Sequence, residues 1–427
     1  MSKKGTYNSG FFGNFAARLH GTPIRFGILI GTPVRDGLRD AVFAAPTPPP
    51  PGDDSEGKPR ASAGDVAALL KSAAGSMRFT DWAVEHVAQI RRLLPAGLEP
   101  CGCFVVAAEA AAKGLAALLV PVLRGMPEAL VLSIDPSSRK LSFWQHTGGA
   151  KPALLPAQVK ADAHKDALLM WTFAQIDVVA PLGPAGESED RDGDDRGLNA
   201  LASRLDIAFE EYLGKCSFAW SNDGAPRRMV DNSSEQLVNG VVPKGAGELQ
   251  CELLRGGTIL DLSSGADEGA CVRQRCSVVA TALVLRRDVE MRSAIELLRR
   301  GVVASAKERL QMALDEAAEA ADGGAARPDV LQLPWRALGR PKDVELPMWC
   351  GDYCLPDESA GAGLERLGEL LGLTGDDFEV APSYLDERGL CDHHYGGQYA
   401  PPSAATQQRS SGKAGGGALP LAACAAA

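Results

Sequence analysis

Apolar and polar positions repeat with a helical period over residues 82–94. One face of the helical net carries Val84, Val87, Ile90, Leu93 and Leu94, and the other carries mainly Glu85, His86, Gln89, Arg91 and Arg92. This division predicts an amphipathic helix over 81–94. Thr80 or Asp81 is its expected N-cap, because a short polar side chain there can accept a hydrogen bond from the first turn.

Three further apolar runs have the character of strands. After Pro95 and Gly97 end the helix, residues 101–106 form a continuous apolar run of the kind found in a sheet that is covered on both faces. The branched residues of 24–32 and the run 40–45 flank a turn-rich segment, so they predict a hairpin.

The chain between 46 and 180 continues this pattern. Residues 46–64 are polar and proline-rich and are expected to be a disordered loop. An alanine-rich helix is predicted within 107–125, strands over 130–134 and 140–145, and one or two strands over 168–179. Together these elements predict an α/β unit with a central sheet flanked by helices.

The pattern divides the chain into five parts. They are an α/β domain over 20–180, an acidic loop over 181–199, a β-rich segment ending in a long helix over 200–321, a smaller α+β unit over 329–387, and a disordered tail over 388–427. The long helix is predicted over 289–321, with a broken apolar face.

Composition narrows the possible partners. The 427 residues are 45% hydrophobic and carry a net charge of −10, which suits a globular protein and argues against a nucleic-acid surface. The glycine-rich segments lack a phosphate-binding motif, so no cofactor and no small-molecule substrate is expected. Ten cysteines without a signal peptide predict a reducing compartment, and no apolar run is long enough to span a bilayer.

Candidate catalytic residues are few. The six histidines form no His-x-His or His-Glu-x-x-His pattern, so a catalytic zinc site is not expected. Cys350, Cys354 and Cys391 lie near His393 and His394 in the sequence, which leaves three interpretations: a thiol nucleophile, a structural zinc site, or packed inert thiols. The spacing favours inert thiols.

One aromatic pair near the C-terminus is a candidate partner anchor. Trp349 and Tyr353 flank the turn residues Gly351 and Asp352, and aromatic side chains often dominate protein interfaces. Burial of the same aromatic residues in the core is the alternative interpretation.

These pieces together resemble the odorant response abnormal protein 4 (Odr-4-like) family. The resemblance covers nearly all of 20–380 and is carried by Phe26-Gly-Ile-Leu-Ile-Gly31, Trp82-Ala-x-Glu85-His86-x-x-Gln89, Leu94-Pro95-x-Gly97-Leu98, Gly102-x-Phe104, Leu333-Pro-x-Arg336, Cys350-x-Asp352-Tyr353 and Asp357-Glu-Ser359.

The resemblance implies a catalytically inactive MPN-like fold. Catalytic relatives place a glutamate after the first strand and a His-x-His at the end of another, where this chain has Thr32 and Val105-Val106-Ala107. Family members resemble non-catalytic partners of the ubiquitin-fold-modifier cysteine peptidase, and residues 329–387 are similar to its non-catalytic half, which implies a heterodimer. The implied partner interface comprises Trp82, Glu85, His86, Gln89, Trp349, Asp352 and Tyr353.

The resemblance also implies a location. The family acts at the cytoplasmic face of the endoplasmic reticulum and supports the trafficking of odorant-type membrane receptors. Animal members finish with one membrane-spanning helix, whereas this chain finishes ALPLAACAAA, so direct membrane anchoring is not expected here and a cytosolic location is the alternative. The alternative to an adaptor is a cryptic cysteine or zinc isopeptidase that uses Cys350, Cys354 and Cys391.

Overall fold

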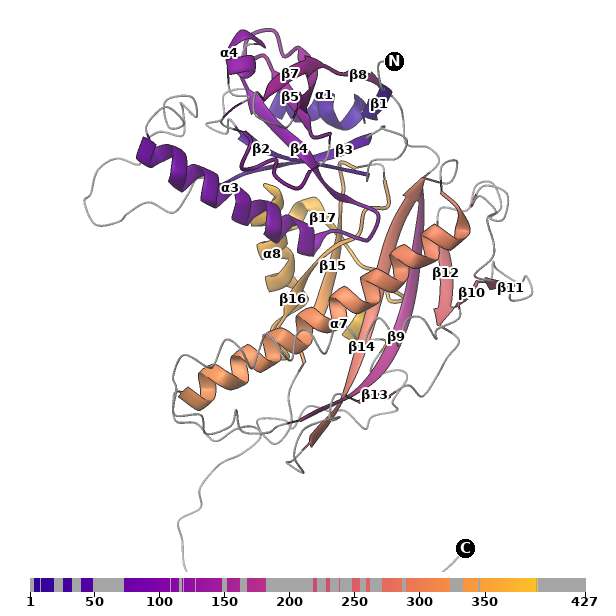
Figure 1. Cartoon of the computed structure of the whole chain (residues 1–427). Helices are drawn as coiled ribbons and strands as arrows, with labels where there is room; N and C mark the ends of the chain where they lie inside the picture. The colour runs from indigo at the N-terminus through magenta and orange to yellow at the C-terminus, as the bar shows by residue number, and fades with distance from the viewer. Residues whose placement is uncertain are drawn as a thin grey trace, which may run out of the picture.

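The described part of the chain folds as a mixed α/β protein, and its strands form three sheets (Figure 1). The computed structural model describes residues 4–7, 9–18, 26–32, 40–48, 73–107, 109–114, 117, 119–126, 128–147, 152–161, 167–181, 218–220, 228–230, 238, 248–253, 259–261, 271–285, 289–322, 333–344, 346–388 and 390. The loop predicted from 46 onward, the acidic loop and the tail lie almost entirely outside these ranges, so their predicted disorder stays a prediction. None of the described helices is long and apolar enough to cross a membrane.

The first sheet has eight strands in the order β7-β6-β5-β4-β2-β3-β1-β8. Their bounds are β1 Lys4–Tyr7, β2 Phe26–Gly31, β3 Asp40–Pro46, β4 Glu99–Val106, β5 Leu130–Ile134, β6 Leu141–Thr147, β7 Ala153–Pro156 and β8 Gln158–Ala161. The predicted hairpin is confirmed, because β2 and β3 pair antiparallel. Every residue of β2 and β3 is buried, which shows that this part of the sheet is covered on both faces.

Helices α1 (Ser9–Arg18) and α3 (Ala73–Leu93) pack against this sheet. Helix α1 contributes an aromatic cluster in which the Phe11 ring lies 4.7 Å from that of Phe43, and the Phe15 ring 5.0 Å from that of Phe104. Such offset and edge-on ring pairs stabilise a core beyond the area they bury. Helix α1 was missing from the sequence prediction.

Two predicted helices differ from the structure. Helix α3 begins at Ala73, so Thr80 and Asp81 lie inside it and the predicted N-cap is wrong. Thr80 is partly exposed and Asp81 is exposed, so their polar groups can contact water. Short polar side chains destabilise a helix interior mainly when they compete for its backbone hydrogen bonds, and contact with water reduces that competition. The alanine-rich helix is short: α4 spans Glu109–Gly114, and 119–125 forms turns, because glycine weakens a helix and Pro121 lacks a backbone donor.

The second sheet is built on two strands of 15 residues, β9 (Ala167–Pro181) and β14 (Cys271–Leu285), which pair antiparallel along their whole length. The shorter strands are β10 Phe218–Trp220, β11 Arg228–Val230, β12 Glu248–Leu253 and β13 Ile259–Asp261. The sequence placed 168–179 with the first sheet. That assignment is wrong, because β9 finds its longest partner in β14, about a hundred residues later.

Helix α7 (Met291–Asp322) confirms the predicted long helix and packs across β9 and β14. Its buried stripe includes Ile295, Leu298, Val302 and Leu310, and also the alanines Ala294 and Ala306. The turn after α3 reaches the same sheet: Ala96 N–H donates to Thr281 O at 2.9 Å, and Leu283 N–H donates to Ala96 O at 2.8 Å.

The C-terminal unit contains β15 (Trp335–Pro341), β16 (Cys350–Cys354), α8 (Ala360–Leu371), the short 3-10 helix η3 (Gly375–Asp377) and β17 (Phe378–Val380). The three strands form a sheet in the order β16-β15-β17. Ser359 caps α8, because its hydroxyl accepts a hydrogen bond from Ala362 N–H, and Gly372 ends the helix at φ 67°. Leu364, Leu367 and Leu371 of α8 enter the core of the first sheet.

Candidate interaction groove

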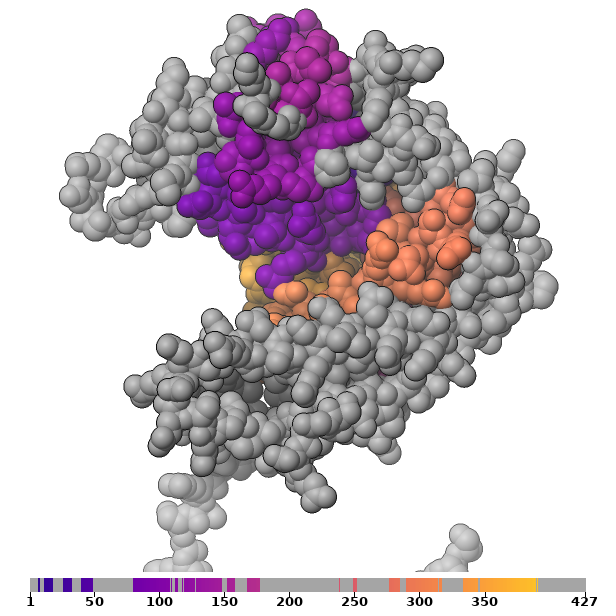
Figure 2. All heavy atoms as spheres, in the orientation of Figure 1, coloured from indigo at the N-terminus to yellow at the C-terminus, as the bar shows by residue number. Residues whose placement is uncertain are grey.

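A groove of about 540 Å³ lies where α3, α7, α8 and β16 meet. Its lining residues are Gln89, Arg92 and Leu93 of α3, Met312 of α7, Asp352 and Tyr353 of β16, Leu355 and Glu358 of the following loop, and Arg366, Glu369 and Leu370 of α8. Figure 2 shows the violet residues directly above the gold residues of the C-terminal unit, with the orange residues of α7 beside them. We call this site the interaction groove.

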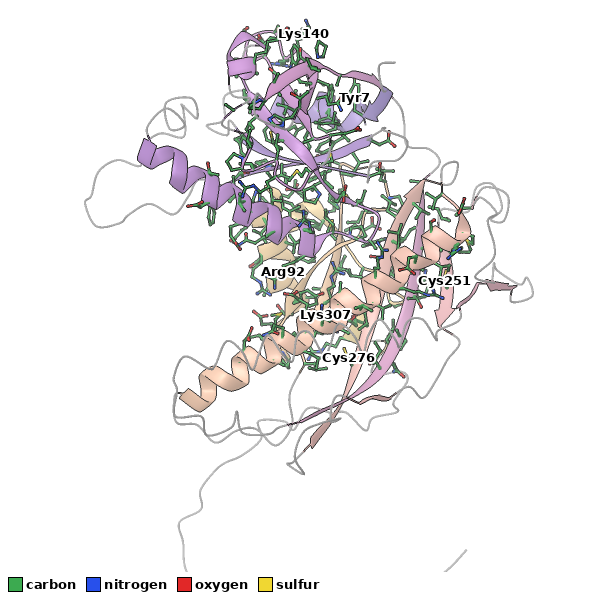
Figure 3. All side chains as sticks on the ribbon, in the orientation of Figure 1. Tyr7, Arg92, Lys140, Cys251, Cys276 and Lys307 are labelled. Carbon is green, nitrogen blue, oxygen red and sulfur yellow. The ribbon has the colours of Figure 1, made fainter. Side chains whose placement is uncertain are left out.

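The end of α3 is held in place by Arg336 of β15. Arg336 Nη2 donates to Leu93 O at 3.0 Å and to Arg92 O at 3.3 Å. The last carbonyl groups of a helix have no partner inside the helix, so this guanidinium group supplies one. Figure 3 shows Arg92 at this end of α3, close to α8 and α7.

Tyr353 joins β16 to α7. Its hydroxyl donates to Ser305 Oγ at 3.2 Å, and its ring lies 5.7 Å from the guanidinium carbons of both Arg309 and Arg336. A cation over an aromatic face is attracted by the negative charge of that face. Tyr353 lines the groove, but these contacts involve most of its side chain, and only 8% of its surface is exposed.

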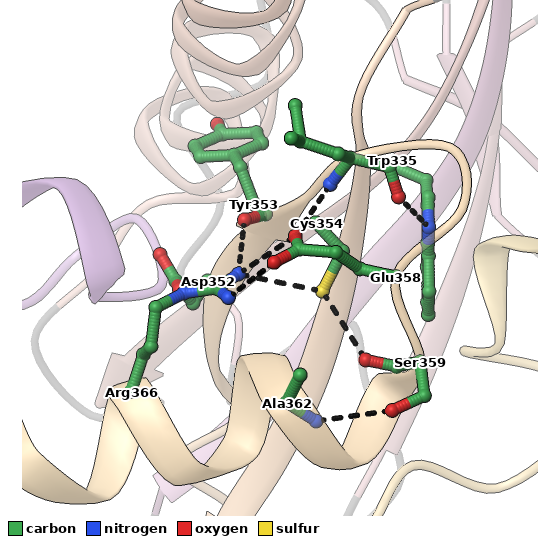
Figure 4. Close-up of polar contacts among 9 residues, drawn as sticks. Trp335, Asp352, Tyr353, Cys354, Glu358, Ser359, Ala362 and Arg366 are labelled. Atoms are coloured by element: carbon green, nitrogen blue, oxygen red, sulfur yellow. Dashed lines mark hydrogen bonds and ion pairs between the residues drawn. The ribbon is translucent and has the colours of Figure 1, made fainter.

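Arg366 of α8 organises the floor of the groove (Figure 4). Its Nε donates to Asp352 Oδ2 at 2.8 Å, its Nη1 to Glu358 Oε1 at 2.7 Å, and its Nη2 to Tyr353 O at 2.8 Å. The hydrogen bond to Glu358 is the main reason why the pKa of Arg366 is raised, and the same bond lowers the pKa of Glu358. Glu358 also accepts from Leu355 N–H, which fixes the loop after β16.

The implied partner residues on α3 lie in different environments. Trp82 Nε1–H donates to Pro48 O at 2.7 Å, and Gln89 donates to the exposed Glu85 at 3.2 Å. His86 is fully buried: its Nδ1 lies 3.1 Å from Thr47 Oγ1 and its Nε2 lies 2.9 Å from Leu370 O. Burial lowers the pKa of His86. Its side chain therefore joins α3 to α8 and offers no surface to a partner.

Trp349 is also part of the core. It is 2% exposed and belongs to the small cluster that contains Leu169, Trp171 and Leu338. Of the seven predicted residues, the structure brings Gln89, Asp352 and Tyr353 together at the groove, while Trp82 and Glu85 lie along α3 outside its lining. Arg366 was not among the predicted site residues. The only signal for it in the sequence is the pair of acidic residues Asp352 and Glu358, which need a cation nearby if they are partly buried.

The thiols proposed for chemistry are poorly placed for it. Cys350 is fully buried, and burial raises the pKa of its thiol to about 12. Burial also raises the pKa of Cys354, whose Sγ lies 3.8 Å from Ser359 O. Cys391, His393 and His394 lie outside the described residues. Within the described ranges, no group of three or more His, Cys, Asp and Glu residues could hold a metal ion.

The end of β4, where metal ligands were considered, carries apolar side chains. Val105 is 2% exposed, and Ala107 N–H donates to Ile134 O at 3.0 Å. The hydroxyl of Ser133 donates to Ala107 O at 2.8 Å. Thr32, at the end of β2, bonds through its N–H to Asp40 O at 3.0 Å. These backbone contacts continue the sheet.

A buried ion pair lies next to Tyr353, one of the lining residues of the groove. Arg309 of α7 and Glu387 are 2% and 1% exposed, and Arg309 Nη2 lies 2.6 Å from Glu387 Oε1. Glu387 also accepts from Val279 N–H at 2.7 Å and from Arg336 N–H at 2.6 Å. The sequence analysis did not find this pair, because its two residues are far apart in the chain.

The chain matches a family model and is similar to solved structures. The family model described as ODR4-like, odorant response abnormal 4-like, matches residues 27–380. No curated protein matches the chain. Among solved structures, the chain is similar to the crystal structure of UfSP from C. elegans, with 10% sequence identity and a TM-score of 0.41. That match covers 86% of this chain and 56% of the UfSP chain.

Proposed function

The chain belongs to the ODR4-like family, and we propose that it is a non-catalytic adaptor. It binds the ubiquitin-fold-modifier cysteine peptidase as a heterodimer and localises it at the cytoplasmic face of the endoplasmic reticulum. It also supports the trafficking of odorant-type membrane receptors. In this proposal the eight-stranded sheet is an MPN-like sheet that has lost its chemistry, with Thr32 and Val105-Val106-Ala107 at the positions of the catalytic residues.

One observation carries the proposal. Gln89, Asp352 and Tyr353, which come from two separate family motifs, meet at the interaction groove. A concave surface with both apolar and charged lining is suited to holding part of another chain. The thiols Cys350 and Cys354, by contrast, have raised pKa values, and a thiol must lose its proton to act as a nucleophile.

Co-expression with the cognate peptidase tests the proposal. We expect the two chains to elute together in size-exclusion chromatography, at an earlier volume than either alone. Two separate peaks at micromolar concentration would contradict the adaptor function. A second assay tests the enzymatic alternative: the purified chain is incubated with a fluorogenic conjugate of the modifier. Turnover that is lost on Cys391→Ala or Cys350→Ala would show an isopeptidase instead.

A further inference from the structure

The apolar part of the interaction groove is open to solvent. Leu355, in the loop after β16, is 37% exposed, and Met312 of α7, which also lines the groove, is partly exposed. A single exposed leucine is common on protein surfaces, but here it lies in a concavity whose volume is in the range of pockets that enclose ligands. Two apolar groups in one concave lining can both contact an aliphatic side chain that enters it.

The two guanidinium groups in the lining are already neutralised. Arg366 pairs with both Asp352 and Glu358. Arg92 forms an ion pair with Glu308 of α7, which lies outside the lining. Lys307, the neighbour of Glu308, does not line the groove and has contacts of its own. The positive charges of the groove are therefore matched by carboxylates.

The negative charges of the groove are in excess. Asp352 and Glu358 share the single charge of Arg366, and Glu369 has no hydrogen bond or ion pair among the described residues. Glu369 is exposed on α8, one turn after Arg366. A partner group that complements this surface is positively charged, because like charges brought together at an interface are unfavourable.

We propose that the interaction groove binds a short peptide segment of a partner protein in which a lysine or arginine lies beside aliphatic side chains. The basic side chain pairs with Glu369, and the aliphatic side chain packs against Leu355 and Met312. This inference rests on the proposed adaptor function, for which it defines the docking surface. Arg366 acts as a positioning residue, since its bonds to β16 hold the floor of the groove in place.

A random 12-residue peptide library displayed on phage, selected on the full chain, tests this inference. We expect selected peptides to contain a basic residue within a few positions of aliphatic residues. Their binding, measured by fluorescence polarisation of the synthetic peptides, should weaken about tenfold or more with Glu369→Lys or Leu355→Asp. Glu365→Lys is the matched control, because it makes the same charge change on an exposed site of α8 outside the groove and should leave affinity within about twofold.

Each outcome has a defined meaning. Selected peptides that are acidic, or that bind Glu369→Lys and Leu355→Asp as well as the unaltered chain, would overturn the groove inference. A selection that yields no binding peptide would overturn it as well. Circular dichroism of each variant, compared with the unaltered chain, identifies any loss of binding caused by misfolding. Co-elution with the peptidase tests the adaptor function by itself, so the two proposals can fail independently.

Discussion

The buried pair Arg309–Glu387 gives the sharpest prediction about stability. Replacing Glu387 with glutamine keeps the size of the side chain but removes the charge that faces Arg309 across 2.6 Å. Burial lowers the pKa of Arg309, and the charge of Glu387 more than offsets this effect in the intact pair. A guanidinium group keeps its proton in proteins even without a partner, so Glu387→Gln leaves a buried charge unpaired. Leaving a buried charge without its partner costs about 3–5 kcal/mol.

The hydrogen bonds of Glu387 support a loss of that size. The carboxylate of Glu387 accepts hydrogen bonds from Arg309 and from the backbone N–H groups of Val279 and Arg336. A glutamine has one acceptor oxygen, and its amide nitrogen would face one of these donors. We therefore expect Glu387→Gln to lower the free energy of unfolding by about 3–5 kcal/mol, measured by urea denaturation followed by tryptophan fluorescence.

Two control variants make the measurement specific. Glu379→Gln removes a carboxylate from the partly exposed pair with Arg340 and should change stability by less than about 1 kcal/mol. The double variant Arg309→Met with Glu387→Leu removes both buried charges and should be more stable than Glu387→Gln alone. A loss below about 1 kcal/mol for Glu387→Gln, equal to that for Glu379→Gln, would refute this account of the buried pair.

Three further predictions concern other parts of the chain. Burial lowers the pKa of His86 in the folded protein, so the unfolded chain binds a proton first as pH falls. The free energy of unfolding should therefore decrease below about pH 6.5 and stop decreasing below the pKa of the folded protein. Urea denaturation at a series of pH values measures this decrease, and the part of it that comes from His86 should be absent in His86→Leu. Gly97→Ala should lower the free energy of unfolding by about 1–3 kcal/mol, and Gly125→Ala should lower it less. Both glycines have a positive φ, but only at Gly97 would an added Cβ lie 2.2 Å from Leu283 O. Equal decreases in melting temperature for the two variants would contradict this explanation. Mass spectrometry after brief iodoacetamide treatment at pH 8 should find Cys350 unmodified in the folded protein and modified in urea, since its buried thiol has a raised pKa; rapid labelling in the folded protein would contradict that burial.

The family motifs acquire physical roles in the folded chain. Arg336 caps the end of α3, and Tyr353 lies between two guanidinium groups and bonds to α7. Glu358 holds Arg366, and Ser359 caps α8. These residues place the elements around the groove, so a motif that identifies the family need not contact a partner itself.

Local sequence patterns were sufficient to predict the elements in which apolar residues repeat at short intervals. The amphipathic helix α3, the hairpin of β2 and β3 and the long helix α7 all follow from spacings of two to four residues, because side chains that face a core repeat at those intervals. The resemblance to the ODR4-like family, carried by motifs along the chain, is confirmed by the match over 27–380.

The folded chain was needed for everything that depends on distant partners. No local pattern shows that β9 pairs with β14, that Arg309 meets Glu387, or that His86 bonds to Leu370 O, 284 residues away. The groove itself joins Gln89 to Asp352 and Arg366. Such contacts depend on how whole elements pack against one another. In the sequence, each partner is only a single polar or charged residue, and nothing near it shows which distant residue it meets.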